Sequence, residues 1–144
     1  MAYQHLAYTF AQSLTERDQT LYAAILHPEY INHNAFAAPD KAGSVAVFFE
    51  GFVPALPDFR VTIEDVFEDG DTLIARVKYT GTFAQPLMGY APNGKTLEMR
   101  SIDIWRVRDG LLFEHWDELN TLDLFMQMGA AQMLAPSAQS ELSV

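Results

Sequence analysis

The sequence predicts an α+β domain in which helices pack on one face of a curved, mainly antiparallel sheet. The apolar residues repeat with a helical period in the first part of the chain, and after Pro57 with the two-residue period of a strand. Asp-Gly pairs, which are typical of hairpin turns, separate the later segments. Helices followed by a run of hairpin-connected strands are the arrangement of an α+β fold.

The first third of the chain reads as two helices. Leu6, Phe10 and Leu14 recur at a spacing of four, which places them on one face of the first helix. Asp18 is a candidate N-cap for a second helix in "DQTLYAAIL", because its side chain can accept a backbone N–H of the first turn. Pro28 in "HPEY" predicts the end of that helix, since proline disfavours helix in the residue before it.

The middle and end of the chain alternate between turn signals and regular segments. "YINHNA" predicts a short strand, and "DKAGSVAVFFEGFVPAL" predicts an amphipathic helix between Pro39 and Pro57. Four strands are then expected at residues 59–67, 72–83, 96–108 and 111–119. Residues 84–95 predict a long loop, and "TLDLFMQMGAAQML" predicts a helix that is interrupted or ends near Gly129.

Length and composition limit the possible classes of protein. With 144 residues, we expect one domain over residues 1–134 and a polar tail over residues 135–144. The formal net charge of -10 disfavours nucleic acid and anionic membrane surfaces as partners. The absence of cysteine excludes disulfides and thiolate chemistry. No secretion signal or membrane-spanning run is recognisable, which predicts a cytoplasmic protein.

The last predicted hairpin carries the densest group of polar and aromatic side chains, "FEHWDELN". If Asp109 and Gly110 are the two central turn residues, Asp103 lies opposite Trp116, and directly opposed residues share a face. One face then holds Met99, Ser101, Asp103, Trp105, Glu114, Trp116, Glu118 and Asn120. The other holds Arg100, Ile102, Ile104, Arg106, Phe113, His115 and Asp117. The pattern alone allows either face to line a pocket, and favours the face with two tryptophans and acids.

The sequence resembles the SnoaL-like polyketide cyclase family. The resemblance rests on "YINHNA", "LPDFRV", "EDGD", "ARVKYTGTF", "APNGK", "IDIWRVRDG", "EHW" and "MQMG", and extends over about residues 20–130. It implies the cone-shaped nuclear transport factor 2-like fold. "IDIWRV" is similar to the ketosteroid isomerase strand that carries an oxyanion-hole aspartate, which matches Asp103 and implies that its face points inward. His33 matches the place of the isomerases' proton-abstracting residue.

The sequence departs from this family at Asn120. The family commonly has an aspartate there that serves as acid and base in its aldol closure, and an amide cannot exchange a proton in that way. Glu118 is the nearest carboxylate that can replace it. Asn120 together with Asp123 also fits a helix N-cap, a role without chemistry.

These observations lead to a functional hypothesis and one alternative. We expect a cofactor-independent enzyme without a bound metal, with isomerase, cyclase or lyase chemistry on a small hydrophobic carbonyl or polyketide-like compound. The candidate catalytic residues are His33 and Asp103. The candidate substrate-binding residues are Trp105, Glu114, Trp116, Glu118 and Asn120. The alternative is a non-catalytic ligand-binding module of the same fold. The resemblance also implies a homodimer that pairs through the outer face of the sheet.

Overall fold

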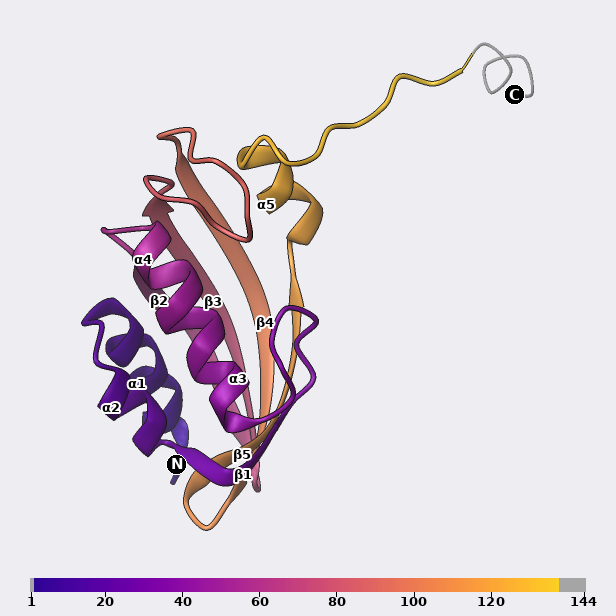
Figure 1. Ribbon diagram of the computed structural model, residues 1–144. Coiled ribbons are helices and arrows are strands. Elements are labelled where there is room, and N and C mark those ends of the chain that lie inside the picture. Colours follow the sequence, from indigo (N-terminus) through magenta and orange to yellow (C-terminus); the bar gives the residue numbers. More distant parts are fainter. Residues whose placement is uncertain (1, 138–144) are drawn as a thin grey trace.

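The computed structural model describes residues 2–137 and confirms the predicted α+β fold, with helices gathered on one side of a curved sheet (Figure 1). The elements in chain order are α1 (Gln4–Thr15), α2 (Gln19–Ala24), β1 (Leu26–Asn32), α3 (Lys41–Ala46), the π-helical segment η1 (Val47–Phe52), α4 (Val53–Ala55), β2 (Arg60–Asp69), β3 (Thr72–Thr82), β4 (Thr96–Arg108), β5 (Leu111–Leu119) and α5 (Thr121–Gln127).

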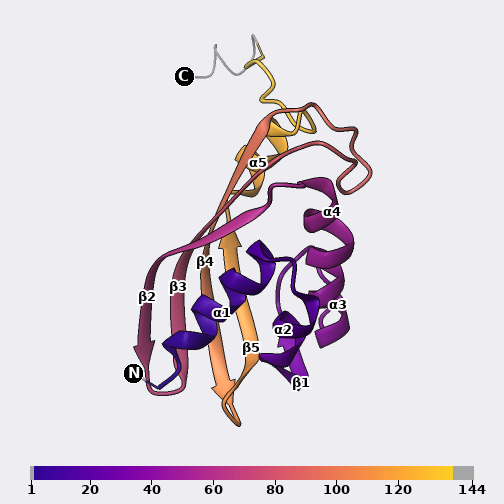
Figure 2. The ribbon, with the colours of Figure 1, turned by 90° about the vertical axis from the view of Figure 1, so that its left-hand side faces the viewer.

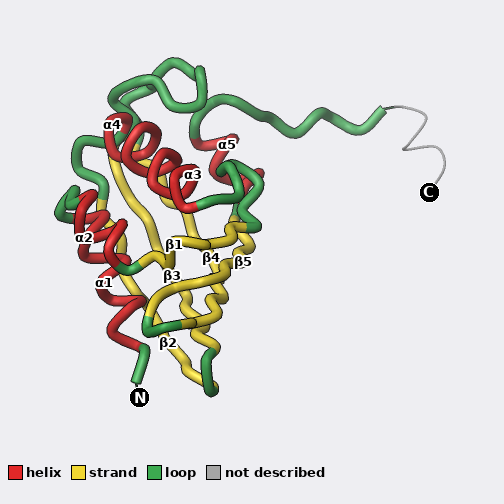
Figure 3. The backbone as a smooth tube through the Cα atoms, turned by 60° about the horizontal axis from the view of Figure 1, so that its bottom comes forward, coloured by secondary structure: helices red, strands yellow, loops and turns green. Residues whose placement is uncertain are grey.

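The sheet has five strands in the order β1-β5-β4-β3-β2. The pairs from β2 to β5 are antiparallel, and β1 runs parallel to β5 at the edge. The helices before β2 lie across one face of this sheet (Figure 2), and the tube in Figure 3 shows α1 and α3 over the same face. That face, called the inner face below, is covered by helices, and within residues 2–137 no helix covers the opposite, outer face.

The helices form where the sequence predicts them. Leu6, Phe10 and Leu14 are all buried against the sheet, which fixes the orientation of α1. The Asp18 carboxylate accepts the N–H of Leu21 at 2.9 Å, as expected of an N-cap. The main difference is at Pro28, where the chain already runs as strand β1 from Leu26 onward.

The segment between Pro39 and Pro57 is one continuous run of helix made of α3, η1 and α4. Asp40 caps it by accepting the N–H of Gly43 at 2.8 Å. Gly43 also permits close packing of the preceding loop, because a Cβ there would lie 2.3 Å from the carbonyl oxygen of Ala38. The loop over residues 33–40, which later contributes to the site, is therefore held tightly against α3.

The hairpin of β4 and β5 differs from its prediction by one residue. The turn itself is as predicted, since Asp109 and Gly110 have φ of 54° and 74°. A bulge then shifts the register between Arg106 and Val107, so that Leu112 pairs with Val107 and Glu114 with Arg106. Phe113 is the extra residue on β5.

This bulge reverses the faces predicted for β5. Asp103 lies opposite Asp117 and Trp105 opposite His115, while Trp116 lies opposite Ile104. A shift of one residue moves every side chain of a strand to the other face. His115 and Asp117 therefore lie on the inner face. Glu114, Trp116 and Glu118 lie on the outer face, and their predicted place beside Asp103 is wrong.

The remaining chain adds little regular structure. Residues 84–95 form the expected long connection between β3 and β4, and α5 ends at Gln127, just before Gly129. No helix within residues 2–137 combines the length and the apolar character needed to cross a membrane. Of the predicted polar tail, residues 138–144 lie outside the described residues.

Candidate active site

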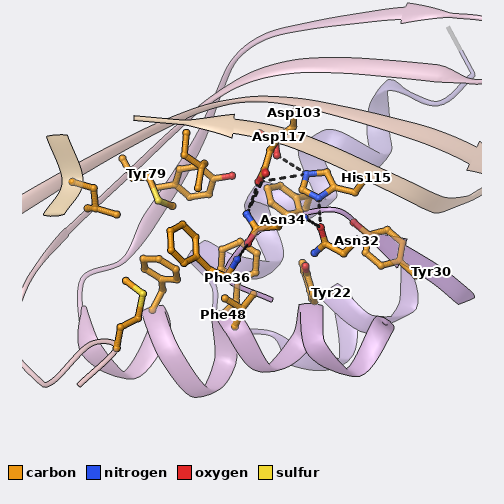
Figure 4. A pocket seen from close by; sticks show the side chains of 17 residues that line it. Tyr22, Tyr30, Asn32, Asn34, Phe36, Phe48, Tyr79, Asp103, His115 and Asp117 are labelled. Carbon is orange, nitrogen blue, oxygen red and sulfur yellow. Dashed lines mark hydrogen bonds and ion pairs between the residues drawn. The ribbon is translucent and has the colours of Figure 1, made fainter. Parts of the chain in front are cut away.

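A pocket lies between the helices and the inner face of the sheet (Figure 4). Aromatic side chains form most of its walls, and five polar side chains meet at one end. The aromatic lining residues are Phe10, Tyr22, Tyr30, Phe36, Phe48, Phe52 and Tyr79. The polar lining residues are Asn32, Asn34, Asp103, His115 and Asp117. An apolar body with a few convergent polar groups is the usual character of a small-molecule site.

His115 and Asp103 form a buried pair at the polar end. Nε2 of His115 lies 2.7 Å from Oδ1 of Asp103, and the two side chains are only 8% and 1% exposed. The imidazole also stacks on Trp105, with ring centroids 5.3 Å apart and an interplanar angle of 24°. Trp105 and His115 also lie directly opposite each other in the hairpin. The stacking and this pairing together fix the position of the imidazole.

The hydrogen bonds around Asn32 determine the protonation of His115. Oδ1 of Asn32 accepts the backbone N–H of Asn34 at 2.9 Å, and its Nδ2 donates to Ser44 at 2.7 Å. Because Oδ1 is an acceptor, Nδ1 of His115, 2.8 Å from it, must be the donor. One proton is then shared between Nε2 of His115 and Asp103, and the pair has no net charge with the proton on either group.

Two hydroxyls extend this network. Ser101 donates to Oδ2 of Asp103, and Tyr79 lies 3.2 Å from the Ser101 oxygen. Burial, and secondarily the nearby Asp103 charge, raise the pKa of Tyr79 well above its ordinary value, so the phenol remains neutral. The same two causes raise the pKa of Tyr22. Both phenol oxygens point toward the polar end of the pocket (Figure 4).

Asp117 is the second carboxylate of the polar end. Its side chain is 9% exposed, and the Asn34 amide donates to its two oxygens at 3.1 and 2.9 Å. Burial raises the pKa of Asp117 above its ordinary value, against the opposing effects of His115 and the Asn34 hydrogen bond. The carboxylates of Asp103 and Glu118 raise it further. A carboxyl group with a raised pKa in a pocket is a candidate for proton transfer.

The pocket is nearly closed. Its enclosed free space is about 30 Å³, which is enough for water but far below the several hundred Å³ of a typical ligand site. The rim residues Phe36 and Met88 are 38% and 42% exposed and lie on the long connections before α3 and before β4. A ligand must therefore displace side chains of this rim to enter.

The structure brings together only part of the predicted site. Asp103 lies in the pocket, as predicted. His33 does not line it: the side chain is 44% exposed, bonds to Glu114 at 2.8 Å and stacks on Trp116 on the outer side of the hairpin. The predicted pairing of His33 and Asp103 across one cavity is therefore wrong.

The predicted substrate-binding residues also lie elsewhere. Trp105 is on the inner face but is 1% exposed and packs between Phe10 and His115, outside the pocket lining. Glu118 faces an outer-surface groove with Ile102. Asn120 occupies the N-cap position of α5, where it accepts the Arg100 N–H at 2.7 Å and donates to Asp123 at 2.9 Å. Glu114 and Trp116 hold His33 on the outer face.

Sequence reasoning assigned the wrong face to His115 and Asp117, and did not select Asn32 or Asn34. The alternation in "NHN" does place both asparagines on the side of β1 opposite His33. That signal indicates an inward polar cluster. It cannot identify the partners on β5, because these depend on the bulge at Phe113.

Asp103, His115 and Asp117 also have the composition of a metal site, with one ligand atom each within 4.8 Å of one another. The 2.7 Å between His115 and Asp103 is, however, a hydrogen-bond distance. It is shorter than the roughly 3.3 Å between two ligand atoms of a tetrahedral site with bonds of about 2.0–2.1 Å. The arrangement therefore favours a shared proton over a shared ion.

Comparison with known proteins places this geometry in context. Residues 5–128 match the family model described as SnoaL-like polyketide cyclase. TsrD from Streptomyces laurentii is 30% identical, with a TM-score of 0.81, over 89% of this chain and 95% of that chain. AclR from Streptomyces galilaeus is 20% identical, with a TM-score of 0.81, over 98% of this chain and 97% of that chain. IdmH from Streptomyces antibioticus is 24% identical, with a TM-score of 0.76, over 90% of this chain and 99% of that chain. None of the curated proteins matches the sequence.

Proposed function

The chain belongs to the SnoaL-like polyketide cyclase family, and from that premise we propose that it catalyses proton transfer at a carbon next to a carbonyl. The substrate is a small hydrophobic carbonyl or polyketide-like compound, and the chemistry is that of an isomerase, cyclase or lyase without a cofactor. The observation that carries the proposal is Asp117, a largely buried carboxyl group with a raised pKa at the polar end of an aromatic pocket.

Asp117 has the properties of the proton acceptor. The Asn34 amide holds both of its oxygens, which fixes the orientation of the carboxylate. Its raised pKa brings its basicity closer to the working pH, which improves general base catalysis. It thereby supplies the carboxylate that the family has at the position of Asn120.

The His115–Asp103 pair supports this acceptor without competing for the proton. The pair has no net charge, so it does not place a second full negative charge beside Asp117. Nε2 of His115 lies 3.9 Å from Oδ2 of Asp117, so the pair is close to the acceptor but not hydrogen-bonded to it. Asp117 takes the proton from the carbon, becomes a neutral carboxylic acid, and then returns that proton to a different atom of the substrate, which restores the carboxylate.

The negative charge that develops on the substrate oxygen needs hydrogen-bond donors. The neutral hydroxyls of Tyr22 and Tyr79 point toward the polar end (Figure 4). Tyr22 can supply one donor, and Tyr79 can supply a second when its hydroxyl turns from Ser101 to the substrate. The aromatic walls exclude water and match a flat, apolar substrate. No lysine or arginine is present among the lining residues, so a substrate with a free carboxylate or phosphate would find no counter-charge there.

The test is exchange of hydrogen for deuterium at the carbon next to a carbonyl. A panel of cyclic ketones and β-keto esters is incubated in D₂O with the wild type, Asp117→Asn and the control Glu118→Gln, and exchange is followed by NMR. We expect exchange with the wild type and the control, and a loss of roughly 10²–10⁴-fold with Asp117→Asn.

Equal exchange by Asp117→Asn and the wild type would contradict the role of Asp117. Binding of the panel without exchange by any of the three proteins would support the alternative, a non-catalytic ligand-binding module. His33→Ala is expected to lose far less exchange than Asp117→Asn, since His33 lies outside the pocket.

We also propose that the protein forms a homodimer through the outer face of the sheet. Phe67, Ile74, Ile104 and Trp116 form an apolar row across β2, β3, β4 and β5. Phe67 and Ile74 are 63% and 38% exposed, which is unfavourable for a surface left in water. We expect a dimer by light scattering for the wild type and a monomer for Ile74→Glu. The control Met133→Glu, at another exposed residue, should remain a dimer. A monomeric wild type would contradict the proposal.

A further inference from the structure

The end of β1 continues along β5 for two residues beyond the strand. Asn32 pairs with His115 in the parallel ladder, and the His33 N–H donates to the His115 carbonyl at 2.9 Å. The side chains of Asn32, His33 and Asn34 alternate between the two faces, as they do in an extended chain. Asn32 bonds to His115 and Asn34 to Asp117 on the inner face. Only His33 lies on the outer face.

His33 makes two contacts there. Its Nε2 lies 2.8 Å from Oε2 of Glu114, and its ring stacks on Trp116 at a centroid distance of 5.0 Å and an interplanar angle of 12°. The guanidinium of Arg106 lies 5.9 Å from the centroid of the same indole. Exposed contacts of this kind contribute little to global stability. Their effect is local, because they fix one backbone position next to Asn34.

We infer that His33 is a positioning residue for Asp117, acting from the outer face of the sheet through its neighbour Asn34. The inference rests on the proposed function of Asp117 as the proton acceptor. Two adjacent residues share one planar peptide unit, so the contacts of the His33 side chain with Glu114 and Trp116 limit the movement of the Asn34 backbone. Without these contacts, the chain beyond Asn32 is no longer fixed along β5, and the Asn34 amide loses its fixed place on the carboxylate.

The structure supplies a readout that a general loss of stability would not move. The Asn34 hydrogen bond lowers the pKa of Asp117, while burial, Asp103 and Glu118 raise it and His115 lowers it. Loss of the Asn34 hydrogen bond by itself therefore raises the pKa of Asp117. Substitution of His33 leaves the charges of His115, Asp103 and Glu118 in place, since none of these side chains contacts the His33 side chain.

The experiment is a ¹³C NMR titration of the Asp117 carboxyl group in the full chain. The variants are His33→Ala, His33→Gln, Asn34→Ala and the double variant, and His5→Ala at an exposed histidine of α1 is the matched control. Asn34→Ala should raise the pKa of Asp117, and His33→Ala should raise it by a smaller amount. His33→Gln, which retains a donor for Glu114, should lie between His33→Ala and the wild type.

The double variant decides between positioning and an independent effect. If His33 acts through Asn34, adding His33→Ala to Asn34→Ala shifts the pKa no further. An unchanged Asp117 pKa in His33→Ala, or the same shift with and without Asn34, would overturn the inference. The titration does not require turnover, so a failure of the proposed function is distinguishable from a failure of this inference. In the exchange assay, His33→Ala should lower the rate by up to roughly 10-fold.

Discussion

Two histidine–carboxylate pairs lie on opposite faces of the same hairpin. On the inner face, His115 and Asp103 are 2.7 Å apart, and their side chains are 8% and 1% exposed. On the outer face, His33 and Glu114 are 2.8 Å apart, with 44% and 26% of their side chains exposed. The two pairs have nearly the same residue types and distances, but solvent reaches the outer pair far more than the inner pair.

The difference teaches which pair can take part in chemistry. Water screens the outer pair and replaces its hydrogen bonds when they break, so that pair contributes little energy and suits a role in positioning. The inner pair is enclosed by Trp105, Asn32 and Ser101, where an unpaired charge or proton has no substitute partner. Only at the inner pair does the loss of a proton or of a partner leave a charge that water cannot stabilise.

The largest expected effect comes from removing the carboxylate of each pair in turn. Asp103→Ala leaves His115 without the acceptor of its Nε2 proton, and should lower the free energy of unfolding by about 3–5 kcal/mol. Glu114→Ala should lower it by less than about 1 kcal/mol. Urea denaturation at pH 7 measures both. Asp103→Asn is the control, because an amide can still donate to His115 and accept from Ser101. Similar losses for Asp103→Ala and Glu114→Ala would contradict the comparison.

The two tryptophans of the hairpin provide the second test. Trp105 is buried between Phe10 and His115, so Trp105→Ala should lower the free energy of unfolding by about 3 kcal/mol. Trp116 is stacked under His33 on the outer face, and Trp116→Ala should cost about 1 kcal/mol. Thermal or urea unfolding of the two variants decides the order. The reverse order would place the structural tryptophan on the other face.

The sequence was sufficient for most of the fold because its signals are local. The four strands from β2 to β5, the Asp-Gly turns and the Asp18 cap each depend on a few neighbouring residues. The inward face of Asp103 was implied by the family resemblance, and β4 has no bulge in its pairing with β3 that would reverse it. The strand and turn predictions depend on alternation within one strand and on turn chemistry, which short stretches of sequence specify.

The pocket wall on β5 could not be predicted in the same way. The bulge at Phe113 adds one residue, and nothing in "LLFEH" requires it. Its tertiary support is visible only in the structure: Phe113 packs against His27 at 5.1 Å, and Arg108 lies over its ring at 3.9 Å. A single residue out of register was enough to exchange His115 and Asp117 with Glu114 and Trp116.

A smaller effect concerns Asn120, where the family resemblance leads us to expect an aspartate. Asn120→Asp introduces that acid but should not raise exchange activity, because this side chain lies at the start of α5, outside the pocket lining. The new carboxylate cannot donate to Asp123 or to the Glu98 carbonyl, and it adds a charge beside Asp123. We expect a loss of about 1 kcal/mol in unfolding free energy. Asn120→Ser, without the charge, is the control, and a gain of exchange by Asn120→Asp would contradict the assignment of Asp117.

The smallest expected effect is a dependence of stability on pH that originates at Asp117. Its pKa in the folded protein lies above the ordinary value of 3.8, mainly because of burial. Between the unfolded and folded values the native state binds more protons, so this group's contribution to stability falls as the pH rises through that window. Asp117→Asn lacks the contribution, and should gain stability relative to the wild type from pH 4 to pH 7. Glu118→Gln, on the outer face of the same strand, should follow the wild type more closely. Urea unfolding of the three proteins across this range measures the difference. A constant gap between Asp117→Asn and the wild type would mean that solvent reaches Asp117 as freely as it reaches the outer face, and the comparison between the two faces would fail at its central residue.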